Sequence, residues 1–197
     1  MAGAWLREES PELAIDRILD AAEKAFVPRG VASVGMAEIA DAAGCSRGTL
    51  YRYFRSRHEL HLAYVKREAQ EIAERVQEET SGVRDPRRRL VAFLQGALRE
   101  TRANPATAAW FAPASSGLAA RMALGPELIE AFTTGFGSRM AASGGAARGA
   151  RLRTRWIVRV IVSLLAHPAA SAAEERALLE RFVVPGLAPS RRDPTRG

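Results

Sequence analysis

Cysteine and histidine are scarce in this sequence. Cys45 is the single cysteine among 197 residues, and there are three histidines. One cysteine excludes an internal disulfide and a cysteine-based zinc site. His58 and His61 stand three residues apart and could pinch a metal, but no third ligand is in view and we expect them to be surface side chains. The sequence therefore predicts no metal and no cofactor.

Long hydrophobic runs are also missing. The longest strongly apolar stretch, Trp156–Ala166, includes Arg159, and it is shorter than the roughly 20 apolar residues that a membrane span needs. The first ten residues contain no apolar segment of signal-peptide length. With 47% hydrophobic and 26% charged residues, the composition is that of a soluble globular protein. We expect a cytoplasmic protein with no membrane partner.

No segment alternates apolar and polar residues as a half-buried strand does. Apolar residues instead recur every three or four positions, so the predicted fold class is all-α. We expect a three-helix helix-turn-helix domain over residues 10–56 and a helical ligand-binding and dimerisation domain over residues 57–188, followed by a disordered tail over residues 189–197. The predicted helices cover approximately residues 11–27, 36–43, 47–54, 57–79, 87–103, 126–140, 150–166 and 172–185.

Basic charge is not concentrated in the N-terminal third as a whole. The formal net charge is +7, but residues 1–60 contain eight basic and nine acidic side chains. Within them, residues 42–58 carry four arginines and no acid. A short electropositive segment inside a near-neutral region indicates a local anionic partner more strongly than the overall charge does.

That segment lies in a helix-turn-helix pattern over residues 35–60. Two short predicted helices meet across Ala43–Ser46, where Gly44 suits a helix C-terminus and Ser46 suits the N-cap of the next helix. Ser56 and Glu59 form a capping box for the long helix behind them. In this layout the second short helix enters the DNA major groove.

The second short helix carries side chains suited to DNA. Arg47 is able to make the bidentate contact to guanine, and Thr49 offers a methyl to thymine or a hydroxyl to phosphate. Tyr51 and Tyr53 offer hydroxyls to phosphates, although core packing is the alternative for Tyr53 and a solvated face for the rest. Arg57 begins the next helix, where free amides also favour phosphate. The predicted DNA-binding residues are Ser46, Arg47, Gly48, Thr49, Tyr51, Tyr53 and Arg57.

The string from Met36 to Leu60, with Ile39-Ala40, Ala43-Gly44 and Ser46-Arg47-Gly48-Thr49-Leu50-Tyr51-Arg52-Tyr53-Phe54, closely resembles the signature of the TetR family of transcriptional regulators. In that family, residues matching Arg47, Thr49 and Tyr51 touch DNA. The position of Arg57 is usually a phosphate-bound lysine, so this chain departs from the pattern while keeping the charge.

The resemblance implies a homodimeric regulator, more often a repressor, that leaves a palindromic operator when a small molecule binds. It also implies a dimer interface built from residues 150–166 and 172–186. The segments Arg155–Leu165 and Phe182–Leu187 resemble a subgroup common in actinobacteria. The rival interpretation is an all-helical enzyme, or a small-molecule-binding protein with no DNA role. No Ser/His/Asp set or cofactor loop supports the enzyme.

Aromatic and methionine residues of the middle of the chain are the candidate lining of a ligand pocket, although each alone also suits an ordinary core. Few polar residues lie between them, so the expected ligand is mostly apolar. The predicted pocket residues are Phe93, Trp110, Phe111, Met122, Phe132, Phe136 and Met140.

Two further features have a plain interpretation beside a functional one. Cys45 is expected to pack as a small apolar residue, with redox sensing as the alternative. The arginines at 148, 151, 155 and 159 recur at helical spacing and are predicted to lie opposite a buried stripe that begins at Trp156. A solvated face is expected for them, with a contact to an anionic ligand or to a partner subunit as the alternative.

Overall fold

The computed structural model describes residues 10–134 and 147–187, and every regular element within them is helical. The predicted all-α fold class is confirmed. The predicted tail over residues 189–197 lies outside the described residues. The elements are α1 (Pro11–Arg29), α2 (Met36–Ala42), α3 (Arg47–Tyr53), α4 (Arg57–Thr80), α5 (Pro86–Ala103), α6 (Pro105–Ala109), α7 (Ser116–Ala123), α8 (Pro126–Phe132), α10 (Ala147–Ala166), α11 (Ala172–Leu178), the π-helical turn η3 (Leu179–Val183) and α12 (Val184–Leu187).

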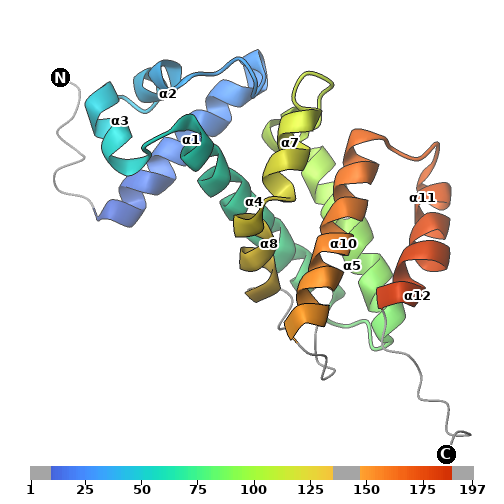
Figure 1. Ribbon diagram of the computed structural model, residues 1–197. Coiled ribbons are helices and arrows are strands. Elements are labelled where there is room, and N and C mark those ends of the chain that lie inside the picture. Colours follow the sequence, from blue (N-terminus) through green and yellow to red (C-terminus); the bar gives the residue numbers. More distant parts are fainter. Residues whose placement is uncertain (1–9, 135–146, 188–197) are drawn as a thin grey trace, which may run out of the picture.

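The helices form two groups that α4 connects (Figure 1). Helices α1, α2 and α3 lie at one end of the molecule, and α4 starts beside α3 and continues into the second group. There α5 and α10 pack beside one another, with α11 and α12 at the outer edge. One hydrophobic cluster runs from Phe26 of α1 through Leu60 and Tyr64 of α4 to Trp110 and Met122, so the core continues across the predicted boundary at residue 56.

Serine side chains cap the N-termini of α1 and α4. The hydroxyl oxygen of Ser10 accepts from the backbone N–H of Leu13, and that of Ser56 accepts from the N–H of Glu59. The capping box is only half formed, because the Glu59 carboxylate accepts from the N–H of Arg55 (2.8 Å) instead of that of Ser56. These caps satisfy amides that have no partner inside the helix.

Two details of the predicted helices are wrong. Pro28 does not stop α1, which continues to Arg29 and ends at Gly30 with φ +77°; a proline in the last turn removes only one helical hydrogen bond. Trp156 does not begin a buried stripe on α10, because it is 48% exposed. It shares the outer side of α10 with Arg155 and Arg159, which are also exposed, whereas Val158 and Val162 are buried.

Helices α4 and α5 approach one another closely at Gly96. A Cβ atom placed on Gly96 would lie 2.6 Å from Cγ1 of Val76, which is fully buried. No real Cβ tolerates that distance, so glycine is required for this pair of helices to pack as they do. The contact holds the second half of α4 against the middle of α5.

Candidate nucleic-acid interface and ligand cavity

The turn between α2 and α3 has the conformation that the sequence predicts. Gly44 has φ +66°, and Ser46 caps α3 by accepting from the N–H of Thr49 at 3.0 Å. Leu50 and Phe54 are buried and anchor the inner side of α3 in the first cluster. The outer side of α3 is therefore held at a set angle to α1 and α2, as a recognition helix requires.

The outer side of α3 carries a guanidinium, a glycine without a side chain and a phenol. Arg47, Gly48 and Tyr51 are exposed, and Tyr51 is 48% accessible. The hydroxyls of Ser46 and Thr49 share a hydrogen bond of 2.9 Å, which holds the Thr49 side chain in one orientation. The sequence-predicted residues from Ser46 to Tyr51 thus come together on one surface.

Tyr53 and Arg57, the two remaining predicted DNA-binding residues, also contact other parts of the protein. Tyr53 is half-buried against the first cluster, with the Arg52 guanidinium 5.2 Å from its ring centre. Nη2 of Arg57 donates to the carbonyl oxygens of Val31 and Ala32, both at 2.7 Å. Arg57 therefore ties the start of α4 to the loop after α1, and a phosphate would have to use its other N–H groups.

Cys45 is 7% exposed and belongs to the first cluster. Burial, assisted by the nearby Asp41 carboxylate, raises the pKa of its thiol above the ordinary value. A thiol that is buried and protonated is a poor nucleophile. These observations support the packing interpretation of Cys45.

His61 is not a surface residue, and that expectation is wrong. It is 2% exposed and makes edge contacts with the rings of Phe26 and Trp110, at 5.6 and 5.0 Å between centres. Burial, together with the charges of Arg57 and His58, lowers the pKa of His61 to about 4. Its imidazole is therefore neutral at pH 7 and behaves as an aromatic core group.

A cavity of about 230 Å³ lies between α4, α5, α7, α8 and α10. This is slightly below the range of roughly 300–1,000 Å³ usual for small-molecule sites. Its described wall is mostly aliphatic and aromatic, and it includes the acid Glu68 and the base Arg153. Helix α10 contributes a large share of this wall, including Ile157, Ile161 and Leu165.

Four of the seven predicted pocket residues line this cavity, namely Phe93, Trp110, Phe111 and Phe132. Met122 is 2% exposed but packs in the first cluster and is not on the described wall. Phe136 and Met140 lie outside the described residues. Tyr64 and Glu68 of α4 also line the cavity and were not predicted from the sequence. Helical periodicity indicates which face of a helix is buried, but not whether that face borders a cavity.

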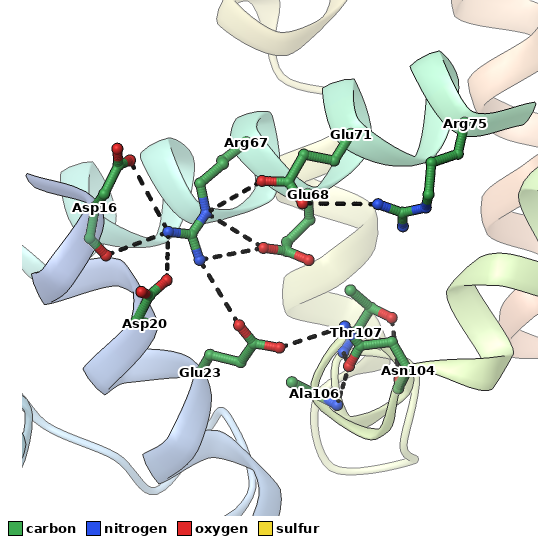
Figure 2. Close-up of polar contacts among 10 residues, drawn as sticks. All are labelled: Asp16, Asp20, Glu23, Arg67, Glu68, Glu71, Arg75, Asn104, Ala106 and Thr107. Carbon is green, nitrogen blue, oxygen red and sulfur yellow. Dashed lines mark hydrogen bonds and ion pairs between the residues drawn. The ribbon is translucent and has the colours of Figure 1, made fainter. Parts of the chain in front are cut away.

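A cluster of acids around one arginine joins α4 to α1 (Figure 2). The Arg67 guanidinium contacts carboxylates of α1 and of its own helix, and its side chain is 17% exposed. Glu23 of this cluster also accepts from Asn104, at the junction of α5 and α6. Burial and the charge of Glu23 raise the pKa of Glu68, while Arg67 opposes that rise. The acids around Arg67 are Asp16, Asp20, Glu23, Glu68 and Glu71, at 4.0, 2.8, 3.7, 3.3 and 3.9 Å.

The described part of the chain contains no candidate metal site and no candidate membrane span. No group of three or more His, Cys, Asp or Glu side chains within residues 10–134 and 147–187 is placed to hold a metal ion. No helix among those residues combines the length and hydrophobicity that crossing a membrane requires.

Comparison with known proteins gives concordant results. Residues 18–64 match the family model described as bacterial regulatory proteins, tetR family. The chain is 44% identical to an HTH-type transcriptional regulator of Mycobacterium tuberculosis over 191 residues, which are 96% of this chain and 94% of the relative.

Two solved structures share the fold. The TetR family repressor AlkX from Dietzia sp. has a TM-score of 0.67 at 24% identity, over 87% of this chain and 93% of that one. The FadR repressor of Thermus thermophilus, solved with lauroyl-CoA, has a TM-score of 0.57 at 20% identity, over 93% of this chain and 99% of that one. At these identities the likeness shows the fold alone.

Proposed function

The chain belongs to the TetR family of bacterial regulatory proteins, and from this premise we propose that it is a homodimeric repressor that leaves its operator when a small molecule fills the cavity. The exposed outer side of α3 is the observation that carries the DNA-binding part. Arg47 is free to reach guanine in the major groove, and the bonded Thr49 hydroxyl leaves its methyl for thymine. Tyr51 is placed for a phosphate.

A homodimer is supported by apolar side chains left exposed at the far end of the molecule. Four large ones lie on α10, α11 and η3, the helices for which the family resemblance implies a dimer interface. A soluble chain covers such a patch when it has a partner surface, and a two-fold axis pairs the patch with its own copy. Two α3 helices about 34–36 Å apart would then bind a palindromic operator. The exposed residues are Leu152, Trp156, Leu178 and Phe182, at 61, 48, 37 and 72%.

Helix α4 links the cavity to the DNA-binding helices. Glu68 is on the cavity wall and also contacts Arg67, which pairs with Asp20 of α1. A ligand that favours one position of α4 therefore acts on α1 through the same side chains. The operator affinity falls by the ratio of the ligand's affinities for the two states. The mostly apolar wall supports a largely apolar ligand.

The test is fluorescence anisotropy with the purified protein and DNA from upstream of its own gene, against scrambled DNA of equal length. Binding is measured at several salt concentrations, because phosphate contacts weaken as salt rises. We expect selective binding that the double variant R47A/T49A loses. The matched control, Lys66→Ala, removes an exposed cation of α4 that lies outside α3, and it should retain the selectivity.

The outcomes separate the candidate functions. Selective binding that depends on Arg47 and Thr49 supports the regulator. Equal binding to both DNAs, followed by an empty selection of bound fragments from the whole genome, would overturn the DNA-binding role. A protein that still bound small molecules under those conditions would be a binding protein without a DNA role.

A further inference from the structure

Hydrogen-bonding groups on the cavity wall differ in whether they have partners. The hydroxyls of Thr101 and Thr107 donate to the carbonyl oxygens of Ala97 and Thr101, at 2.8 and 2.7 Å. Two residues of the described wall carry a buried polar atom with no hydrogen-bond partner, namely Oη of Tyr64 and Nε1 of Trp110. Folded proteins satisfy nearly all buried polar atoms, so two exceptions in one cavity wall need an explanation.

The two unpartnered groups are neighbours on a rigid support. The rings of Tyr64 and Trp110 stack at 10°, with 5.9 Å between centres. Phe26 of α1 makes edge contacts with both, at 5.3 and 5.8 Å. Tyr64 is 1% and Trp110 3% exposed, so bulk water does not satisfy them. This part of the wall is the side of the cavity nearest α1.

The chemistry of the two groups selects an acceptor. An indole N–H only donates. The Tyr64 phenol stays protonated at neutral pH, because burial and the carboxylates of Glu68 and Glu23 raise its pKa, and it too has a proton to donate. A ligand oxygen with free lone pairs would satisfy both needs.

The charges around Tyr64 decide which kind of oxygen fits. Glu68 follows Tyr64 by one turn of α4 and lies on the same cavity wall, so its carboxylate brings negative charge to this part of the cavity. Arg67 is the nearby cation, but carboxylates already surround it. A carboxylate or phosphate placed beside Tyr64 would therefore meet like charges in a poorly solvated space. A neutral oxygen meets no such penalty.

We propose that the cavity recognises a mostly apolar molecule through one neutral hydrogen-bond acceptor, such as a ketone or ester carbonyl, bound by Trp110 Nε1–H and Tyr64 Oη–H. The inference rests on the proposed function, in that it takes the cavity to be the ligand site. The apolar part of the ligand lies along Ile157, Ile161 and the other aliphatic residues of α10. The polar end lies one helical turn from Glu68, beside the junction of α4 with α1.

The experiment compares four probes of similar length that differ in their polar group: octane, methyl hexyl ketone, octanoate and octylamine. Affinities are measured by isothermal titration calorimetry on the full chain. We expect the ketone to bind about tenfold tighter than octane, the scale of one net hydrogen bond. Octanoate and octylamine should bind no better than octane.

Two variants locate the effect. Tyr64→Phe keeps the ring and removes the hydroxyl, so the ketone should lose about tenfold in affinity while octane is unchanged. The melting temperature should hold or rise, because an unpartnered buried hydroxyl has been removed. Thr101→Val is the matched control on the same wall. Its hydroxyl already has a partner within α5, so the ketone-to-octane ratio should stay as in the parent protein.

Four results would overturn the inference. Equal affinities for ketone and octane in both the parent and Tyr64→Phe would remove the polar subsite. Tightest binding by octanoate, lost in Arg153→Gln, would assign an anion site to Arg153 instead, and tightest binding by octylamine would assign the recognition to Glu68. Binding by none of the probes would overturn the cavity as their site. The operator measurement on the same preparation tests the DNA-binding role separately.

Discussion

Arg67 of α4 and Asp20 of α1 form an ion pair in which Nη1 lies 2.8 Å from Oδ1. The same guanidinium is within 4.0 Å of four other carboxylates, and Arg67 is less exposed than the aspartates it contacts. One guanidinium thus balances the negative charge of several carboxylates of α1 and α4. The contact joins the DNA-binding helices to the wall of the cavity through Glu68.

Replacing Arg67 by Met should lower the free energy of unfolding by about 2 kcal/mol at pH 7. Loss of a buried partner leaves uncompensated charge at a cost of about 3–5 kcal/mol, and we reduce that figure because Asp16 and Asp20 are half exposed. The loss should shrink as the pH falls, since protonation of Glu68, whose pKa is already raised, removes the repulsion. Urea unfolding at several pH values measures both effects.

The matched control for this variant is Arg75→Met. Arg75 is 49% exposed and pairs with Glu71 and Glu100 at 3.7 and 3.6 Å. Exposed pairs contribute about 0–1 kcal/mol. Equal effects of the two variants would show that the Arg67 cluster is no more than a surface network.

His61→Phe should remove a pH dependence of stability. The pKa of His61 is about 4 in the folded chain, below its ordinary value of 6.5. Between those values the unfolded chain binds a proton that the folded chain does not, so stability falls as the pH drops from about 6.5 to 4. Between pH 6.5 and 4 the free energy of unfolding of the variant should therefore rise by about 3 kcal/mol relative to that of the parent. Above pH 7 the difference between the two proteins should not depend on pH.

Chemical denaturation of the variant and the parent from pH 4 to 8 measures this difference. If the stability of His61→Phe fell with pH as steeply as that of the parent, the imidazole would be charged in the folded protein between pH 6.5 and 4. That result would contradict its burial among Phe26 and Trp110.

Gly96→Ala should destabilise the protein by about 1–2 kcal/mol, although alanine is the better helix former. The added methyl would lie 2.6 Å from Val76 Cγ1, and overpacking of about 1–3 kcal/mol exceeds the roughly 0.5–1 kcal/mol gained in the helix. A double-mutant cycle with Val76→Ala should show a favourable coupling of about 1 kcal/mol, as expected for residues in contact. Strictly additive effects would place the two helices further apart than described.

If the chain forms the proposed homodimer, Phe182→Asp should convert it to a monomer and weaken operator binding. Phe182 is 72% exposed in the single chain, and a charge at the centre of an apolar interface costs several kcal/mol. Sedimentation velocity measures the change. Leu13→Asp is the control, because Leu13 is 55% exposed on α1, far along the chain from α10 and η3. A dimer that survives Phe182→Asp but not Leu13→Asp would move the interface to the other end of the molecule.

The local structure of this protein followed from its sequence. Helix periodicity predicted α1 to α5 within a few residues, and Ser46 and Gly44 identified the turn before α3, because caps and left-handed positions depend on residues close together in the chain. The exposed surface of Arg47 and Tyr51 followed from the same local pattern. The four aromatic residues on the cavity wall were predicted as part of a candidate pocket lining, from their place among the apolar residues in the middle of the chain.

The tertiary structure decided what surrounds each helix. The periodicity of α10 shows where its apolar residues lie, but not whether an apolar residue meets the core, a cavity or another subunit. The outward position of Trp156 could therefore not be predicted from the sequence. His61 is buried, and Arg67 gathers carboxylates from α1, because contacts 30 to 50 residues apart leave no local pattern. The sequence also does not show that the polar atoms of Tyr64 and Trp110 lack partners. Tertiary packing decides this, because it stacks the two rings without supplying a hydrogen-bond partner for either.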